Sequence, residues 1–505
     1  MLFTILDCYT DEPAGLGVPP YIGTYARYIA GAVLDAGHNY NYITIDDLRK
    51  FVSKKEQKGM KTDIKIRNLS GNFPNLGKIL NKTDSLIIIA GVHTPGKYLG
   101  AVPGTTKEVI GLLNKIKKKF FTILTGPAAY GSGLYGGRVA RAIEKDLQKF
   151  DLVVPEIEYK LKDLLANNFE ADVSVAPNYD DLRKIAVLGA EVARQFPSYP
   201  NIIAEIETSR GCPRKVHCSF CTEAIKFCAM EKRGINDITD EVKALHNQGV
   251  TNFRLGKQSC FYSYGSADDI KNLLKECRRY AAVLHIDNAN PAMVTEEKTK
   301  VIADYCTAGN VAAFGVESFD KDVIKKNKLN STPEQVYNAV KIINKYGAKC
   351  RENGMPKFLP GINLIYGLIG ESRKTHEENF KWLKKILDDN LLLRRINIRQ
   401  VVVFPGTLLA NECGDKFIKK NKRYYWKWRN EIRQKIDSPM LKKLVPVGTV
   451  LRNVFTEIYD GKTTFGRQIG AYPLIVGIKK RIPLGKYIDV RITGHMLRSV
   501  IGEVL

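Results

Sequence analysis

Six apolar, strand-like segments separated by helical stretches fill the region from about residue 200 to residue 410. In chain order they read IIAEIETS, TNFRLGKQS, AVLHIDNA, VAAFGVES, GINLIYGL and RINIRQVVVF. Strands that alternate with helices predict a parallel sheet covered by those helices, and six such units predict a barrel or partial barrel of the β/α type. Because functional groups gather where the strands of such barrels end, we expect the site at these carboxyl ends.

Residues 1–150 show a second α/β pattern. The predicted strands are LFTILDCY, YNYITIDDL, SLIIIAGV and FFTILTGP, with a helix over YARYIAGAVLDAG. Near-continuous apolar strands are typical of parallel sheets buried on both faces, so we predict a doubly wound, Rossmann-like domain. Ligands bind beyond the carboxyl ends of such strands, which makes residues 91–98 and 125–137 candidate binding loops. We predict a helical connector over 151–200 and the barrel core over 201–440.

The C-terminal residues 446–505 change to short β-rich runs broken by DGK, IGAYP and PLGK. This pattern predicts a small antiparallel β-barrel. The segment is itself basic, with nine basic and four acidic residues.

Residues 416–435, just before this segment, interleave basic and aromatic side chains. Such a stretch can bind nucleic acid through phosphate contacts and base stacking. We favour the alternative, an exposed helix whose aromatic side chains pack inward.

The chain as a whole is strongly basic. Its 505 residues include 78 Lys and Arg against 53 Asp and Glu, a formal net charge of +25. This charge favours a polyanionic partner such as RNA or DNA, and the alternative is a charged surface of the kind found in thermophiles. No run of about 18 apolar residues is present, so we predict no membrane span. The N-terminus has no basic region or small-residue cleavage site, so we expect a first strand, no signal peptide, and a cytoplasmic protein.

Three of the ten cysteines lie close together in the segment ETSRGCPRKVHCSFC, at Cys212, Cys218 and Cys221. In a reducing compartment, clustered cysteines more often bind metal than form disulfides. A structural zinc ion requires four ligands, and His217 is the available fourth, although coordination by adjacent residues would be cramped. Three thiolates also suit a 4Fe–4S cluster in which one iron has no protein ligand. The remaining cysteines are scattered, and we predict that most are small buried hydrophobic residues.

The motif RGC followed by CSFC, after the first barrel strand, resembles the radical S-adenosylmethionine (SAM) superfamily. The usual spacing in that superfamily is Cys-x3-Cys-x2-Cys, so the first gap here has two extra residues. The later segments FRLGKQS, HIDNANP, AFGVES, GLIGES and VVFPGT match further superfamily positions in the correct order.

This resemblance implies that the three cysteines hold a 4Fe–4S cluster whose open iron binds SAM. A low-potential electron donor then allows reductive cleavage to a 5′-deoxyadenosyl radical, with the protein supplying position and excluding water. The residues that the resemblance places near the cofactor are Phe220, Gly256, Gln258, Glu317, Ser318, Gly367 and Gly370.

The N-terminal region resembles the cobalamin-binding-type domain that precedes many radical SAM barrels. The matching residues are Pro19, Pro20, Gly23, Ala36, Gly37, His38 and Asp46. The lower-ligand motif D-x-H-x-x-G is absent. His93 lies on a suitable loop, but we interpret it as a polar loop residue, and cobalamin binding stays open.

The C-terminal LGKYIDVRITGHMLRSVIGEVL resembles the end of a TRAM domain, the small RNA-binding barrel of the tRNA methylthiotransferases. The whole architecture is similar to theirs, but their N-terminal domain carries three cysteines for a second cluster, and this one has only Cys8. The leading hypothesis is therefore a radical SAM enzyme that modifies RNA, with tRNA as the first candidate. One alternative is a cobalamin-dependent radical methylase or oxidoreductase acting on a small molecule or protein. Another is a non-catalytic RNA-binding protein with a structural metal.

Overall fold

The computed structural model describes residues 1–9, 21–53, 71, 75–91, 102–134, 140–170, 178–227 and 229–505. The candidate residues Pro19, Pro20 and His93 lie outside these ranges. The chain divides into two compact units. The first contains Met1–Ile206 and Arg233–Asn252, and the second contains Glu207–Lys232 and Phe253–Leu505.

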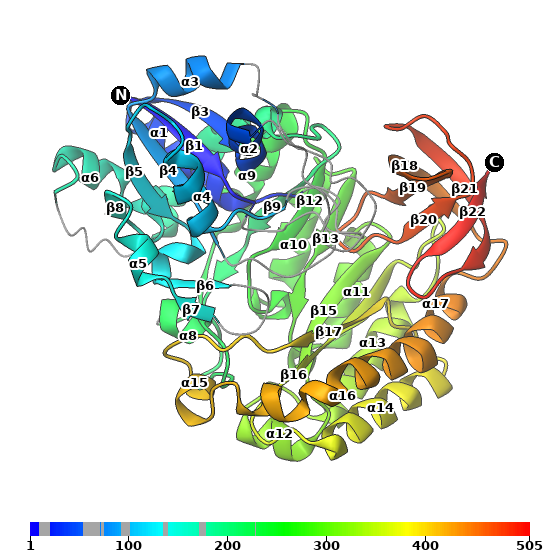
Figure 1. Cartoon of the computed structure of the whole chain (residues 1–505). Coiled ribbons are helices and arrows are strands. Elements are labelled where there is room, and N and C mark those ends of the chain that lie inside the picture. The colour runs from blue at the N-terminus through cyan, green and yellow to red at the C-terminus, as the bar shows by residue number, and fades with distance from the viewer. Residues whose placement is uncertain are drawn as a thin grey trace. The chain divides into compact units, whose positions relative to one another are not determined.

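The first unit is built on a parallel sheet with strand order β3-β1-β4-β5-β8. Its strands, blue to cyan in Figure 1, are β1 (Leu2–Asp7), β3 (Asn39–Thr44), β4 (Ser85–Ile89), β5 (Phe121–Thr125) and β8 (Leu152–Val153). The connecting helices are α1 (Thr24–Asp35), α2 (Ile45–Ser53), α3 (Leu76–Lys82), α4 (Thr106–Leu113) and α5 (Glu144–Leu147). Every residue of β4 is buried, which is why it reads as a continuous apolar run. The predicted Rossmann-like sheet is confirmed.

Further helices of this unit pack against α1. They are α6 (Leu161–Ala166) and α7 (Tyr179–Leu188), with a 3-10 turn, η4, over Gly189–Gln195, and α9 (Ile235–Asn247) packs in turn against α7 and η4. Gly31 and Gly189 allow the close approach, because a Cβ at either position would clash with the carbonyl group of Ile185 or Arg27. The buried carboxylate of Glu241 then pairs with both Arg27 and Arg233, which satisfies three charges in the interior.

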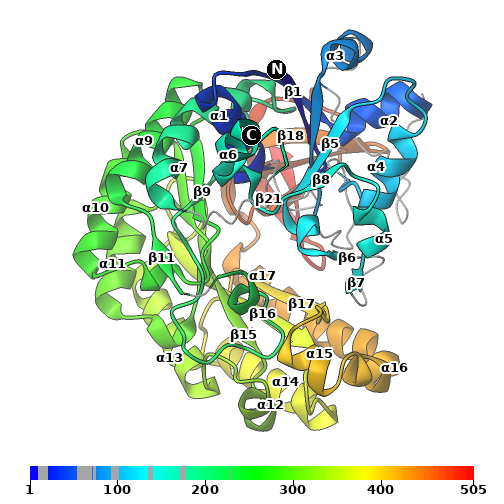
Figure 2. The ribbon, with the colours of Figure 1, turned by 90° about the vertical axis from the view of Figure 1, so that its left-hand side faces the viewer.

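The second unit contains most of the β/α barrel. Its strands are β12 (Asn252–Gly256, whose first residue belongs to the first unit), β13 (Val283–Ile286), β14 (Asn288–Ala289), β15 (Asn310–Glu317), β16 (Phe358–Tyr366) and β17 (Arg395–Gln400). The intervening helices are α10 (Ala267–Arg278), α11 (Glu296–Tyr305), α12 (Lys321–Lys326), α13 (Pro333–Gly347), α14 (Arg373–Asp388) and α16 (Lys416–Ile432). Strands β14 to β17 pair in parallel, and Figure 2 shows α10, α11 and α13 in an arc outside them. The expected partial barrel is confirmed, with the third predicted strand interrupted at Asp287.

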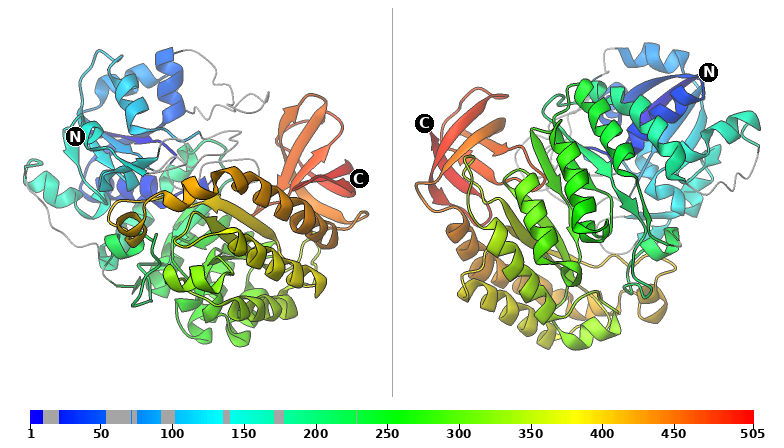
Figure 3. Two further views of the ribbon diagram at one scale, coloured as in Figure 1. Left: turned by 60° about the horizontal axis from the view of Figure 1, so that its bottom comes forward. Right: turned by 180° about the vertical axis from the view of Figure 1, so that it is seen from behind.

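Residues 450–504 close into a small barrel in the order β18-β19-β20-β22-β21, orange to red in Figure 3. The strands are β18 (Val450–Asp460), β19 (Thr463–Gln468), β20 (Ile475–Ile478), β21 (Tyr487–His495) and β22 (Val500–Val504). The predicted small barrel is confirmed, but β20 and β22 pair in parallel. A closed ring with an odd number of strands cannot alternate direction throughout, so one parallel pair is required.

The small barrel docks on the β/α barrel within the second unit. The backbone N–H of Ala471 donates to Nδ1 of His285 at 3.0 Å, and the Tyr472 hydroxyl donates to Asp287. Gly354 lies so close to the Val450 carbonyl that a side chain there would clash. No helix among the described residues has both the length and the apolar character needed to cross a bilayer.

Candidate functional site

The three clustered cysteines lie on one loop that a short antiparallel ladder closes at its base. β10 (Ser209–Arg210) pairs with β11 (Glu231–Lys232). Gly211 stands at the entrance of the loop with φ +75°, where a side chain would clash with the backbone of Ala229. A residue without a Cβ is therefore required immediately before Cys212.

Local hydrogen bonds order the loop around the thiols. The backbone N–H of Cys221 donates to the carbonyl oxygen of Cys218 at 3.1 Å. One guanidinium nitrogen of Arg214 lies 3.2 Å from Sγ of Cys218, and the other donates to the carbonyl oxygen of Lys328 at 2.9 Å. Arg214 therefore links the cysteine loop to the residues that follow α12.

Burial is the main influence on the pKa values of two of these thiols, Cys218 and Cys221. It raises the pKa of Cys218 to about 12, against the effect of the Arg214 guanidinium and with a further rise from Cys221. Burial also raises the pKa of Cys221, and Cys212 is among the neighbouring groups that add to the rise. The thiols are thus close enough to influence one another. Thiolates are the metal-binding form, so metal or cluster binding here would release protons.

The three thiols do not converge on one point. Among the residues that the structure describes, no group of three His, Cys, Asp or Glu side chains is close enough to hold a single metal ion. Nδ1 of His217, the proposed fourth zinc ligand, is buried without a hydrogen-bond partner. The thiolates of an iron–sulfur cluster bind different irons, so a cluster does not require the three sulfurs to meet at one metal ion.

Gln258 follows the carboxyl end of β12 and is almost completely buried. Its amide nitrogen donates to the Leu255 carbonyl at 3.1 Å, whereas its Oε1 has no partner. The next residue, Ser259, donates to the carbonyl oxygen of Gly211 at 2.9 Å, next to the first cysteine. The predicted residue Gly256 ends β12, and its carbonyl accepts the Thr208 N–H at 3.3 Å. An acceptor atom without a donor therefore lies beside the cysteine loop.

Glu317 ends β15 and supplies a second such acceptor. Its backbone has φ +62°, and its Oε2 is buried without a partner. Burial raises the pKa of Glu317 to about 8, and Arg399 opposes the rise. Glu317 also contributes to the raised pKa of Cys218, which places this carboxyl group near the cluster loop. Two unpaired acceptors near three thiols fit a ligand that carries amino and hydroxyl donors, as SAM does.

The predicted glycines 367 and 370 form the turn after β16. Both have positive φ, +101° and +85°, and side chains there would crowd Ile418 and Lys326. The Gly367 N–H donates to the Glu371 carboxylate, and burial raises the pKa of Glu371 to about 7. The turn is thus fixed by backbone geometry and one buried carboxyl group.

Two other predicted residues have different surroundings. Ser318 is buried, and its Oγ accepts the N–H of Asp320 at 3.1 Å, so its side chain already has a partner within the turn. Phe220 is half-buried between Ser219 and the last cysteine.

Sequence reasoning missed Asn327, which joins two parts of the site. This fully buried residue contacts the Ser219 hydroxyl through its Oδ1 at 2.7 Å. Oδ1 also accepts the Ile369 N–H at 3.1 Å, and Nδ2 donates to the Ile369 carbonyl at 2.9 Å. One amide therefore links the cysteine loop to the turn at 367–370, and a lone Asn after a helix gives no sequence signal of that role.

The accessible polar face of β16 and β17 was also missed. Along β17, Ile396 and Ile398 are buried, whereas Arg399 is exposed. Asn397 lies 3.2 Å from Asn363 on the neighbouring strand. The alternation in the segment INIRQ was the signal for this face.

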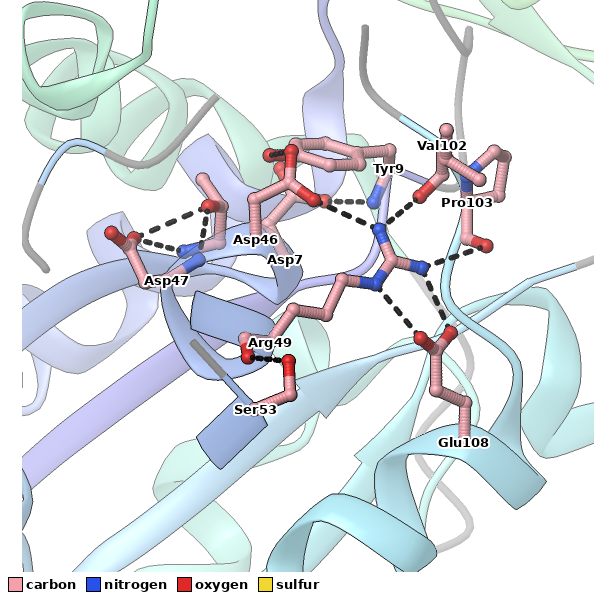
Figure 4. Close-up of polar contacts among 10 residues, drawn as sticks. Asp7, Tyr9, Asp46, Asp47, Arg49, Ser53, Val102, Pro103 and Glu108 are labelled. Carbon is pink, nitrogen blue, oxygen red and sulfur yellow. Dashed lines mark hydrogen bonds and ion pairs between the residues drawn. The ribbon is translucent and has the colours of Figure 1, made fainter. Parts of the chain in front are cut away.

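The carboxyl edge of the sheet in the first unit holds a different polar cluster, shown in Figure 4. Arg49 bonds to Asp46 at 2.9 Å, to Glu108 at 2.8 Å and to the Val102 carbonyl at 2.8 Å. The Tyr9 hydroxyl donates to Asp46 at 3.2 Å. Cys8 beside them is fully buried, and burial raises the pKa of its thiol. The polar side chains labelled there bond to one another or to nearby backbone groups.

Comparison with known proteins decides the family. The protein MJ0274 of Methanocaldococcus jannaschii is 45% identical over 99% of this chain and 93% of its own length. The family model described as the radical SAM superfamily matches residues 206–383, which include the three cysteines and the ends of β12 and β15. The chain belongs to the radical SAM superfamily. Radical SAM proteins are enzymes that use a 4Fe–4S cluster, SAM and a reductant, so the non-catalytic alternative is set aside.

Two further proteins are similar over most of the chain. The ribosomal protein uS12 methylthiotransferase RimO of Phocaeicola vulgatus is 22% identical over 63% of this chain and 72% of its own length. The structure of the radical SAM methyltransferase TsrM from Kitasatospora setae, with cobalamin and a 4Fe–4S cluster bound, matches with a TM-score of 0.52. It covers 81% of this chain and 73% of TsrM at 12% identity, so it shows the fold alone.

Proposed function

We propose that this radical SAM enzyme modifies RNA, with the cluster on Cys212, Cys218 and Cys221. The observation that carries the site is one loop with three neighbouring thiols beside two buried, unpartnered acceptors. When bound, the cluster and SAM supply the one-electron chemistry that generates a carbon-centred radical. Gln258 and Glu317 accept hydrogen bonds from the cofactor, Arg214 and Asn327 hold the loop, and the buried surroundings limit access of water.

The remaining cofactor contacts follow from the positions of the predicted residues. Gly256 ends a strand beside the loop, and the backbone turn at Gly367 and Gly370 lies at the same edge of the barrel. Phe220 adjoins the last cysteine, and Ser318 shapes the turn after Glu317. We assign 201–440 to the radical SAM core, 1–150 to a cobalamin-binding-like domain, 151–200 to a helical connector and 446–505 to an RNA-binding barrel.

The small barrel supports RNA as the substrate. Lys479, Lys480 and Lys486 are exposed on the turn between β20 and β21, and Tyr487 beside them is 50% exposed. Arg481 on the same turn lies over the Tyr459 ring, 5.0 Å from its centroid. Exposed cations next to accessible aromatic rings provide phosphate contacts and stacking. Because Cys8 is buried and without cysteine neighbours among the described N-terminal residues, we do not assign sulfur insertion from a second cluster there.

A cobalamin-dependent methylase or oxidoreductase acting on a small molecule or protein is the second candidate. The fold match to TsrM and the parallel sheet of the first unit favour it. Anaerobic loading with cobalamin followed by gel filtration is the test, because bound cobalamin has its own visible spectrum. Protein that elutes without cobalamin would remove this candidate.

The leading function is tested in two stages. Anaerobically reconstituted protein should hold about four irons per chain and absorb broadly in the visible range. With SAM and dithionite it should form 5′-deoxyadenosine, and Cys218→Ser should abolish both signals while the buried Cys306→Ser retains them. Nucleosides from total RNA of a deletion strain are then compared with wild type by mass spectrometry. Loss of a modified nucleoside supports RNA modification, and an unchanged nucleoside profile overturns it.

A further inference from the structure

Helix α16 presents two different faces. Ile418, Asn421, Tyr425, Trp428 and Ile432 are buried against the barrel. On the opposite side Trp426 is 62% exposed, and Tyr424 is 38% exposed. The expectation that the aromatic side chains of this helix pack inward is therefore correct for Tyr425 and Trp428 and wrong for Tyr424 and Trp426. The heptad-like spacing of the buried residues explains the division, because only every third or fourth residue faces the core.

The exposed side of α16 is basic and mostly unneutralised. The helix has seven basic residues and one acidic residue. We define the α16 basic face as Lys416, Lys420, Arg423, Trp426 and Lys427. None of its four cations forms an ion pair with an acidic side chain in the part of the chain that the structure describes. Like charges three and four residues apart destabilise a helix, so this arrangement has a cost unless an anion neutralises it.

The neighbouring outer helix α14 shows what a solvated helix of this protein looks like. It carries five basic and three acidic residues. Lys384 pairs with Asp388 at 2.7 Å, and Lys385 pairs with Asp389 at 2.8 Å. Figure 3 shows the two helices side by side on the same barrel. A general excess of lysine would give both helices the same pattern, so the unpaired charge is a property of α16.

Aromatic rings lie among these cations. The Arg423 guanidinium lies 4.6 Å from the centre of the Tyr424 ring, and that of Arg429 lies 5.1 Å from the centre of the Trp426 ring. An exposed indole beside a guanidinium group and further cations is a surface on which an unpaired base can stack while its phosphate is neutralised. The apolar side of α16 is already buried, so the helix lacks the free apolar face that binds a bilayer surface.

The position of α16 relates this surface to the site. Near its N-terminus, Asn421 donates to the Glu371 carboxylate at 2.9 Å, and Ile418 lies against Gly367. Its C-terminus continues through residues 433–437 into α17 (Ser438–Leu444) and then β18 of the small barrel. The helix spans roughly 25 Å at about 1.5 Å per residue. It thus runs from the turn beside the candidate cofactor site to the segment that leads into the small barrel.

We propose that the α16 basic face binds an unpaired segment of the RNA substrate. The phosphates contact Lys416, Lys420, Arg423 and Lys427, and a base stacks on Trp426. This inference rests on the proposed function, since it names the surface that guides RNA between the small barrel and the site.

The test measures RNA affinity of the full-length protein as a function of salt, with total tRNA and an unstructured oligouridylate as probes. The fourfold variant K416Q/K420Q/R423Q/K427Q should bind at least tenfold more weakly near 0.1 M salt. Its slope of log affinity against log salt should fall by about 3, at about 0.7 per single-strand phosphate contact. Trp426→Ala should weaken binding about fivefold or more and leave the slope unchanged.

A matched variant of α14, K374Q/K381Q/K384Q/K385Q, removes the same charge from the neighbouring helix and should retain the wild-type slope. Both variants should form 5′-deoxyadenosine at the wild-type rate without RNA, which shows that the core is intact. Equal weakening by the two helix variants would mean diffuse charge and overturn the inference. If the wild type binds RNA and the α16 variant binds it with the same affinity and salt slope, only this inference is overturned. If the wild type binds no RNA, the proposed RNA function itself is overturned. The last measurement uses vesicles of phosphatidylserine and phosphatidylcholine. If the fourfold α16 variant loses vesicle binding but keeps its RNA affinity, the inference is also overturned.

Discussion

Replacement of Asn327 by alanine should loosen the cysteine loop without touching any cluster ligand. The Asn327 amide satisfies the Ser219 hydroxyl and both backbone groups of Ile369. A buried polar group left without a partner costs about 1–3 kcal/mol, so three such groups correspond to about 3 kcal/mol or more. At about 1.4 kcal/mol per factor of ten, the local opening constant should rise by roughly a hundredfold.

Hydrogen exchange is the suitable assay, because a chain with two compact units need not unfold in one step. Amides in the cysteine loop and at Ile369 should exchange up to about a hundredfold faster in the variant, and iron retention after gel filtration should fall. Asn344→Ala is the matched control, because the Asn344 amide bonds to both backbone groups of Leu392. Its Nδ2 donates to the Leu392 carbonyl at 3.0 Å, and its Oδ1 accepts the Leu392 N–H at 2.7 Å. It should accelerate exchange at Leu392 and leave the cysteine loop and the iron content unchanged. Wild-type exchange at Ile369 and in the cysteine loop of Asn327→Ala would refute this reasoning.

Two further predictions concern backbone strain and pH. Gly211→Ala should lower iron content and 5′-deoxyadenosine yield at least tenfold, because its φ of +75° and the nearby Ala229 backbone exclude a side chain, whereas Gly234→Ala, with no atom within 4 Å of its Cβ position, should change neither. Full activity of Gly211→Ala would contradict the loop geometry. Burial lowers the pKa of His285 to about 4 from its usual 6.5, so neutral His285 stabilises the fold fully above pH 6.5, and about 3 kcal/mol is lost as the pH falls from 6.5 to 4. The protection factor of the Ala471 amide, whose N–H donates to His285, should fall as the pH falls across that range, once the slower intrinsic exchange at low pH is divided out. It should depend less on pH in His285→Asn, and an identical pH profile in this variant would exclude His285 as the cause.

Much of the candidate site could be read from local patterns. The predicted site residues lie at or just after the ends of strands that the apolar periodicity predicts. They are the three cysteines, Gln258, Glu317, Gly367 and Gly370. Asn327 could not be found in this way. Its role depends on its contacts with Ser219 and Ile369, 108 and 42 positions away, and neighbours at such separations are set by packing and not by local sequence.

The sequence alone determined the order of the elements and their periods: buried parallel strands in two regions, a small β-barrel at the end, and a thiol loop after the first barrel strand. These features follow from local rules, because strand and helix periods and glycine turns depend on adjacent residues. Only the tertiary structure decided that α9 packs in the first unit with α7, that Trp426 faces outward while Trp428 is buried, and that Gln258 and Glu317 keep unpaired acceptors. Burial and hydrogen-bond pairing are properties of surfaces brought together by the fold, so no local pattern could fix them.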